Sequence, residues 1–248
     1  MVNNWLKNIQ RVFYPPLCLL CDARVGAAPE SHGLAEVEAD LCAACAADLP
    51  YLKHACAGCA LPLPLDKEPG KVSLCGRCLQ KRPVFEYAQA MFHYQSPIDT
   101  LILGLKFNAQ LSHARLLGQL MAGRLAHSEI PQPELLVPVP LHRQRLRERG
   151  FNQSLELARH IGRILAVPVA VDICRRQRET AKQSSLPASE RRRNVRNAFV
   201  CQSSLMGRHV TIVDDVMTTA CTANELAQAL RRAGARRVDV WVCARVSV

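Results

Sequence analysis

Two adjacent carboxylates, Asp214 and Asp215, are the residues best placed to do chemistry. They end an apolar run at 208–215 that has the composition of a buried strand, and a helical pattern follows at 222–234. Carboxylates at such a strand end can accept hydrogen bonds from paired ribose hydroxyls and support a hydrated Mg²⁺ ion. Between the acids and the helix lies a turn of small and hydroxyl-bearing residues, called the phosphate loop below: Thr218, Thr219, Ala220, Cys221 and Thr222. Because unpaired N–H groups at a helix N-terminus bind anions, the segment predicts a site for a phosphorylated ribose.

Eight cysteines form a second group with ligand chemistry. They occur as four Cys-x-x-Cys pairs: Cys18 and Cys21, Cys42 and Cys45, Cys56 and Cys59, and Cys75 and Cys78. The first two pairs are separated by 20 residues and the last two by 15, which is the spacing of zinc-ribbon knuckles. Two S₄ sites would then hold two structural Zn²⁺ ions and leave no open coordination position. Disulfides and iron–sulfur ligation are the alternatives, and a cross-braced pairing of first with third and second with fourth also stays open.

Charge and hydropathy limit the class of protein. Residues 141–196 carry most of the net charge of +11, whereas residues 1–80 are close to neutral. A basic stretch favours polyanions such as a nucleic-acid backbone, although a solvated arginine-rich surface is the alternative explanation. No apolar run approaches the ~20 residues of a membrane helix, and the N-terminus has no secretory leader. These features predict a cytoplasmic protein without membrane insertion.

The hydrophobic pattern changes near residue 80 and divides the chain into a cysteine-rich module (1–80) and a second domain (81–248). In the second domain, short apolar runs alternate with longer amphipathic ones, as in α/β proteins. We predict strands at 88–94, 134–140, 208–215 and 238–246, and helices at 98–107, 114–126, 154–165 and 222–234. The expected fold class is α/β, with a largely parallel sheet flanked by helices and preceded by a double zinc ribbon. Cys174, Cys201 and Cys243 are interpreted as small core residues.

The segment VTIVDDVMTTACT, which contains the acids and the phosphate loop, resembles the phosphoribosyl pyrophosphate (PRPP) motif of the type I phosphoribosyltransferases. The resemblance implies that the acids hold the ribose and that the loop holds its 5-phosphate. Ala220 stands where the motif has glycine. If this position needs a positive φ, alanine strains it by ~1 kcal/mol or more.

Three further segments resemble the ComF and GntX family of competence proteins: ILGLKF (102–107), PVPLHRQRLRERGFNQSLELA (138–158) and RRQRETAKQSSLPASERRRNVRNAF (175–199). The resemblance implies that one strand-end loop meets pyrophosphate, namely Pro138, Val139, Pro140 and Leu141. It also makes Lys106 a candidate anion contact and implies that arginines of 175–196 close over the pyrophosphate. The other positions that match the family pattern are Arg149, Asn152, Gln153, Thr180, Gln183 and Arg191.

The family resemblance implies a phosphoribosyltransferase-like protein that binds PRPP with Mg²⁺ and handles single-stranded DNA during natural transformation, beside other competence proteins. As an enzyme, it would transfer the 5-phosphoribosyl group from PRPP to a nitrogen nucleophile. The alternatives are a PRPP-sensing or DNA-binding protein without turnover, and a phosphoribosyltransferase of nucleotide salvage. The acceptor base is left unassigned.

Overall fold

The computed structural model describes residues 16–25, 40–64, 73–177 and 195–247. The chain divides into two compact units, Met1–Leu49 and Pro50–Val248. The first unit contains the first four cysteines and the short helix α2 (Ala43–Ala47). The second unit contains the other four cysteines together with the sheet. The change in composition near residue 80 and the division into compact units therefore fall at different places.

Four parallel strands form the sheet of the second unit, in the order β1-β6-β5-β2. Their bounds are β1 Tyr87–His93, β2 Leu135–Pro138, β5 His209–Met217 and β6 Arg237–Arg245. The central strands β5 and β6 are almost entirely buried, which explains their near-continuous apolar sequences. Because parallel strands share one carboxyl edge, β5 carries the acidic pair toward the edge where ligands bind in such sheets.

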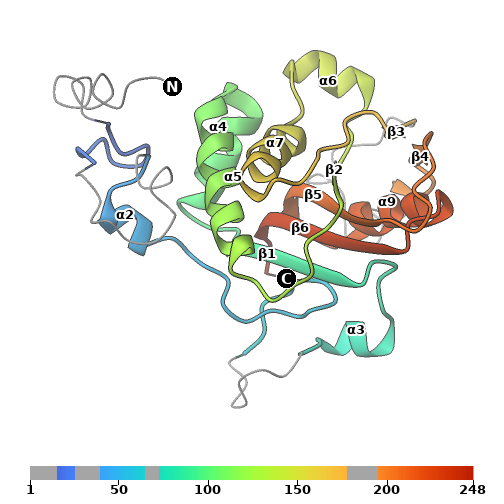
Figure 1. Ribbon diagram of the computed structural model, residues 1–248. Helices are drawn as coiled ribbons and strands as arrows, with labels where there is room; N and C mark the ends of the chain where they lie inside the picture. The colour runs from blue at the N-terminus through green and yellow to red at the C-terminus, as the bar shows by residue number, and fades with distance from the viewer. Residues whose placement is uncertain (1–15, 26–39, 65–72, 178–194, 248) are drawn as a thin grey trace. The chain divides into compact units, whose positions relative to one another are not determined.

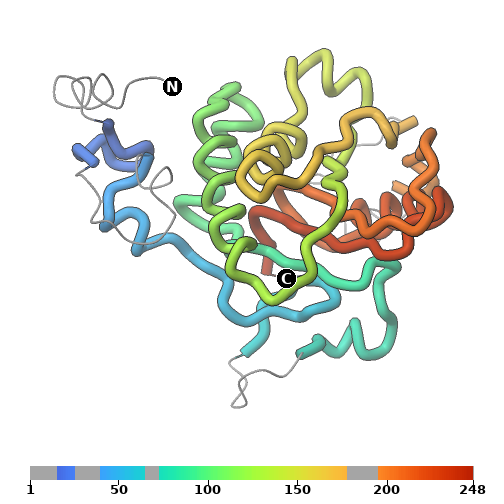
Figure 2. Tube along the Cα trace, viewed as in Figure 1, coloured from blue at the N-terminus to red at the C-terminus, as the bar shows by residue number. Residues whose placement is uncertain are grey.

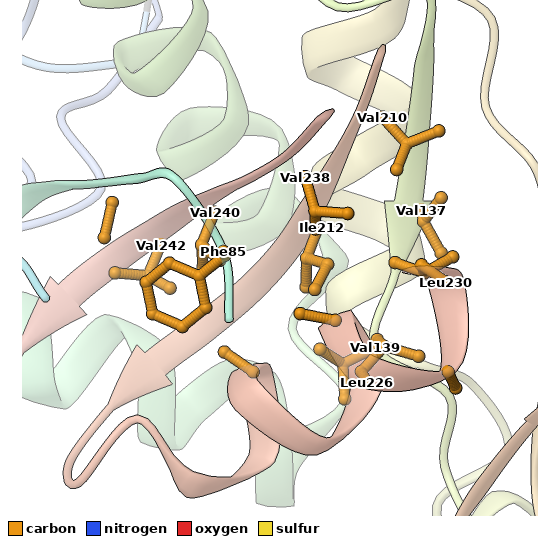
Figure 3. Close-up of a cluster of buried hydrophobic side chains, with 14 of the residues drawn as sticks. Phe85, Val137, Val139, Val210, Ile212, Leu226, Leu230, Val238, Val240 and Val242 are labelled. Carbon is orange, nitrogen blue, oxygen red and sulfur yellow. The ribbon is translucent and has the colours of Figure 1, made fainter. Parts of the chain in front are cut away.

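Helices cover both faces of this sheet (Figure 1). One face carries α4 (Ile98–Asn108), α5 (Leu111–Ala126) and α7 (Gln153–Leu165), and the other carries α9 (Cys221–Arg232). On the α9 face, Val238, Val240 and Val242 of β6 pack in one buried cluster with Leu226 and Leu230 (Figure 3). Burial of each such side chain contributes about 1.5–3 kcal/mol, so this cluster holds α9 and the loop before it against the sheet.

The segment that follows residue 50 runs beside β1 (Figure 2). The Leu52 N–H donates to the Met91 carbonyl at 2.9 Å, and the ring centroids of Tyr51 and Phe92 are 5.0 Å apart. Leu52 and Ala60 belong to the same buried cluster as α9. The third Cys-x-x-Cys pair is therefore built into the core of the second unit. Helix α3 (Gly76–Gln80) carries the last cysteine of the fourth pair.

The predicted fold class is confirmed, because helices flank a parallel sheet and the eight paired cysteines form two groups. The predicted strands and helices are all present, with ends shifted by a few residues. The sequence pattern does not predict the short elements α3, α6 (Arg143–Arg149), β3 (Cys174–Arg176) and β4 (Phe199–Cys201). Within the described ranges, no helix combines the length and the apolar character that crossing a membrane would need.

One feature of the cysteines was not predicted. Cys174 lies in the buried core and Cys201 packs against it, but the two also pair across the antiparallel strands β3 and β4 and form a disulfide. Periodicity could not show this, since the two short strands meet only through their tertiary pairing. Cys243 is fully buried in β6, as predicted.

Candidate functional site

Three elements converge on the acidic pair at the end of β5. Asp214 accepts a hydrogen bond from Ser154 Oγ at 2.9 Å, and its Oδ1 also accepts from the Asp215 N–H at 2.9 Å. Asp215 forms an ion pair with Lys106 and lies 3.5 Å from Gln153 Nε2. Gln153 and Ser154 begin α7, and Lys106 lies in the last turn of α4. Both carboxylates are thus held by helices on the same face of the sheet.

The electrostatics of the pair are set by burial and by Lys106. Burial by itself would lower the pKa of Lys106, but Asp215 outweighs burial and raises it. Burial would raise the pKa of Asp215, but Lys106 lowers it. Burial, and then the negative charge of Asp215, raise the pKa of Asp214 to about 8. The two carboxyl groups therefore titrate as a coupled pair, in which Lys106 favours the ionised form of Asp215 and burial disfavours the ionised form of Asp214.

The corner between α6 and α7 places an arginine near the acids. The Arg149 guanidinium lies 5.7 Å from the centre of the Phe107 ring and donates to Gln153 Oε1. Asn152 caps α7, and its Nδ2 donates to the Val139 carbonyl at 3.0 Å. This corner therefore links the end of β2 to the residues that hold Asp215.

The phosphate loop connects β5 to α9 and contains two unusual residues. Ala220 is the N-cap of α9 and has φ 60° and ψ 5°, the left-handed region that favours glycine. The condition for strain at this alanine is therefore met. Thr219 Oγ1 is buried and has no hydrogen-bond partner among the residues that the structure describes. A buried hydroxyl without a partner is rare, and beside the N–H groups that begin α9 it is well placed to bind a phosphate oxygen.

A cavity of about 320 Å³, called the acid-pair cavity below, lies between the acidic pair and the phosphate loop. Its walls include most of the predicted binding residues: Lys106, Val139, Leu141, Arg149, Gln153, Asp214, Asp215, Thr218, Thr219, Ala220, Cys221 and Thr222. Pro138 and Pro140 are not among its wall residues, and Asn152 acts on the site through its bond to Val139. Thr180, Gln183 and Arg191 lie outside the described residues.

Sequence reasoning missed several walls of this cavity. Tyr94 and Phe107 line it without having been predicted as contacts, and Arg145 lines it as well. Arg176 also lines it and belongs to the segment 175–196, whose arginines were expected to close over pyrophosphate. Tyr94 directly follows β1, so its place at the carboxyl end of a parallel strand was the available signal. Ser154 could be identified only as a residue at the start of a helix, and its bond to Asp214 depends on the packing of α7 against β5.

The eight paired cysteines form two tetrads. Cys18, Cys21, Cys42 and Cys45 make the first, and Cys56, Cys59, Cys75 and Cys78 make the second. In each tetrad the sulfur atoms lie within 4.8 Å of one another, which suits tetrahedral zinc and rules out the cross-braced pairing. Against the effect of burial, backbone hydrogen bonds lower the pKa of Cys18 to about 6, and backbone and side-chain hydrogen bonds lower that of Cys75 to about 7. The pKa values of Cys45 and Cys78 in the same tetrads are raised, chiefly by neighbouring cysteines and by burial respectively, and zinc binding requires these thiols to lose their protons.

One buried arginine connects the second tetrad to the phosphate loop. Arg245, at the end of β6, donates from Nε to the Cys59 carbonyl at 3.0 Å. Its Nη1 donates to the Met217 carbonyl at 3.2 Å and to the Thr218 carbonyl. The backbone of a tetrad cysteine and the first residue of the phosphate loop are therefore held by the same guanidinium group.

Known proteins are similar both to the cysteine-rich module and to most of the whole chain. A family model described as a double zinc ribbon domain matches residues 9–79. The DNA utilization protein YhgH of Escherichia coli (strain K12) is 36% identical over 235 residues, which cover 93% of this chain and 97% of that protein. Competence protein F of Haemophilus influenzae is 35% identical over 178 residues, which cover 69% of this chain and 78% of that protein.

Among solved structures, the chain is similar to a glutamine PRPP amidotransferase from B. subtilis. The two share 21% identity over 53% of this chain and 26% of that chain, with a TM-score of 0.37. This overlap is too partial to add to the fold described above.

Proposed function

The chain belongs to the family of the DNA utilization protein YhgH and competence protein F, and from that premise we propose that it binds PRPP in the acid-pair cavity. We further propose that it works in the cytoplasm on single-stranded DNA taken up by the cell. Binding of PRPP is the primary proposal, and transfer of its phosphoribosyl group is the reaction that the site suits best.

One observation carries this proposal: the acidic pair, the phosphate loop and four cations surround a single cavity. The cations are Lys106, Arg145, Arg149 and Arg176. PRPP carries a 5-phosphate at one end and pyrophosphate at the other, with the ribose diol between them. A cavity with an anion-binding loop on one side and arginines on another matches that distribution of charge.

In the proposed reaction, the bond from C1 of the ribose to pyrophosphate breaks, and its electron pair leaves with the pyrophosphate. A nitrogen nucleophile forms the new bond to C1 and loses a proton. The acids accept hydrogen bonds from the ribose hydroxyls and face the positive charge that develops at C1, while Arg145, Arg149 and Arg176 stabilise the leaving group. The phosphate loop holds the other end of the substrate, so that C1 stays in place.

Among the described residues that line the acid-pair cavity, the acidic pair is the carboxylate group available for Mg²⁺. Lys106 already neutralises Asp215, so a hydrated ion that accompanies the pyrophosphate fits these residues better than an ion bound directly by both acids. When bound, Mg²⁺ supplies positive charge to the pyrophosphate.

Calorimetry with PRPP, with and without Mg²⁺, tests the binding proposal. We expect binding by the wild type and at least tenfold weaker binding by Asp215→Asn, because the substitution removes the negative charge and replaces one of the two acceptor oxygens by an NH₂ donor. Asp172→Asn is the matched control, since Asp172 is exposed and does not line the cavity. Absence of heat with the wild type, or equal affinity in D215N, contradicts the proposal. Thermal unfolding of D215N checks that the fold survives the loss of the partner of Lys106.

Release of pyrophosphate from labelled PRPP, measured with a panel of bases and nucleosides, tests the reaction. Turnover with one acceptor identifies an enzyme. Tight binding without release of pyrophosphate identifies a PRPP sensor.

A further inference from the structure

A second cavity, of about 330 Å³, lies on the other side of the phosphate loop, between that loop and the second tetrad. We call it the tetrad cavity. Thr219, Ala220 and Cys221 line both this cavity and the acid-pair cavity. Cys59, Cys75 and Cys78 line it from the tetrad. One short loop therefore separates a predicted phosphoribosyl site from a space that no part of the proposed reaction uses.

The walls of the tetrad cavity are fixed in place. Arg245 bonds both the Cys59 carbonyl and the Met217 carbonyl, at 3.0 and 3.2 Å. Asn224 of α9 accepts from the Val84 N–H at 2.8 Å, which ties the chain after α3 to the helix after the phosphate loop. All of these residues belong to the second compact unit. The cavity is thus a built feature of that unit.

The opening of the tetrad cavity is positively charged. Arg77, Lys81 and Arg82 line it and are exposed, and none of them pairs with a carboxylate among the described residues. Glu225 is the one carboxylate among the described residues of the walls, and it already accepts from the Asn197 N–H at 3.0 Å. The four cysteines of a zinc-filled tetrad share two net negative charges and are buried in the tetrad, whereas these three cations face solvent.

The size and lining of the cavity narrow the class of ligand. Its volume is at the small end of ligand pockets, which suits one sugar–phosphate unit. Among the described residues that line it there is no aromatic side chain, so these walls offer a base no stacking surface. Arginine and lysine at the opening instead suit phosphate groups. The ligand that fits is a phosphate-bearing chain held by its backbone without regard to sequence.

We propose that the tetrad cavity binds backbone phosphates of a single-stranded nucleic acid beside the phosphoribosyl site. This inference rests on the proposed function, because it gives the DNA-handling role a location. Under this proposal, residues of the second tetrad and of the phosphate loop line the same nucleic-acid binding site. The competing role for Arg77, Lys81 and Arg82 is to neutralise the zinc-filled tetrad.

Fluorescence anisotropy with a labelled 20-mer of deoxythymidine tests this assignment over a series of salt concentrations. The variant is Arg77→Gln with Arg82→Gln. The matched control is Lys53→Gln with Arg232→Gln, which removes the same charge from exposed residues outside both cavities. We expect R77Q/R82Q to weaken binding of the 20-mer about tenfold at low salt and to reduce the slope of log K against log salt by about 1. The control keeps the wild-type slope and affinity.

Two measurements on the same proteins separate the possible causes. Zinc content and PRPP affinity stay unchanged in R77Q/R82Q if the cavity binds nucleic acid. Loss of zinc from R77Q/R82Q, or wild-type affinity for the 20-mer, overturns the assignment. Thymidine monophosphate is the competitor. If it displaces the labelled 20-mer as well as unlabelled 20-mer does at equal phosphate concentration, the ligand is a free nucleotide and the proposal of a nucleic-acid strand is overturned. If the wild type does not bind PRPP but still binds the 20-mer in a salt-dependent way, the PRPP proposal is contradicted and the nucleic-acid proposal is not.

Discussion

Thr219 and Ala220 are neighbours in the phosphate loop, and each carries a local energetic cost. The Thr219 hydroxyl is buried without a partner in the described structure, and Ala220 adopts a left-handed conformation. Strain and unsatisfied polar groups collect at functional sites because the surrounding fold holds them there. Both residues can be changed with little effect on shape, so each gives a clean test.

Thr219→Val replaces the unpartnered hydroxyl by a methyl group of similar size. We expect equal or slightly higher stability in the absence of ligand, because no protein hydrogen bond is lost. We also expect about tenfold weaker binding of PRPP, because one hydrogen bond to a charged phosphate group is lost. Denaturant unfolding and calorimetry measure the two quantities. Unchanged PRPP affinity would mean that this hydroxyl does not contact the ligand.

Ala220→Gly relieves the positive φ. We expect the free energy of unfolding to rise by about 1 kcal/mol, because glycine adopts this conformation without steric cost. In a domain of this size the melting temperature would rise by about 2–4 °C. Ala126→Gly is the control: Ala126 ends α5 outside the left-handed region, so glycine there should destabilise the protein. A destabilised A220G would show that the strain is compensated elsewhere.

Much of the site at this scale could be predicted because the acids and the loop are contiguous in sequence. Lys106 and Gln153 were also predicted as site residues, but their pairing with Asp215 could not be predicted. Lys106, Ser154 and Asp215 are far apart along the chain, and only the packing of α4 and α7 on one face of the sheet brings them together.

At the scale of elements, the long strands and helices follow from their periodicity, whereas α6 and the β3–β4 pair do not. Helix α6 has seven residues, four of them arginine, and no buried face that would give an apolar stripe. Strands β3 and β4 have three residues each, so they are too short to show alternation. Yet α6 and β3 both contribute arginines to the acid-pair cavity.

The two tetrads should differ in their effect on the site. Cys75→Ala removes a ligand from the second tetrad, which Arg245 connects to the phosphate loop, and we expect loss of one zinc and at least tenfold weaker PRPP binding. Cys42→Ala is the matched change in the first tetrad, and it should lose one zinc with PRPP affinity unchanged. Metal analysis measures the zinc content of the two variants, and calorimetry measures their affinity for PRPP. Equal effects of the two variants would contradict a special role for the second tetrad.

The disulfide between β3 and β4 should depend on redox conditions. In the cytoplasm, glutathione and thioredoxin keep such pairs reduced, so the proposed location predicts free Cys174 and Cys201 in protein trapped with an alkylating agent at lysis. Oxidation in vitro should then stabilise the protein by about 3 kcal/mol, because a loop of intermediate length is closed. Mass spectrometry reads the first result and denaturant unfolding the second. A fully oxidised pair in cells would argue against the proposed location.

At the scale of the whole molecule, composition and packing mark different boundaries. Cysteine density falls near residue 80, but Leu52 and Ala60 belong to the hydrophobic core of the second unit. The sequence could not predict that Leu52 and Ala60 pack in this core. A metal-binding segment shows little hydrophobic periodicity, so its sequence does not indicate which core it packs against.

Truncation tests where the folding unit begins. A chain starting at Pro50 should fold cooperatively, bind one zinc and keep PRPP affinity, because the second tetrad, the core and both cavities lie within it. A chain starting at Lys81 should lose stability and PRPP affinity, since it lacks Leu52, Ala60 and the tetrad. Circular dichroism, zinc analysis and calorimetry give the answer. A stable, PRPP-binding chain from Lys81 would restore the boundary near residue 80.

The pairing of β1 with β6 also has a consequence for how the protein is made. A ribosome finishes both tetrads before it begins the sheet, and β1 must then wait for β6, which lies more than a hundred residues further along. At typical rates of synthesis that wait is on the order of ten seconds. During it, zinc can already hold the third and fourth cysteine pairs in shape, whereas the exposed edge of β1 has no partner. Zinc supply during translation would then govern the yield of native protein, and zinc-starved cells should accumulate aggregated chains.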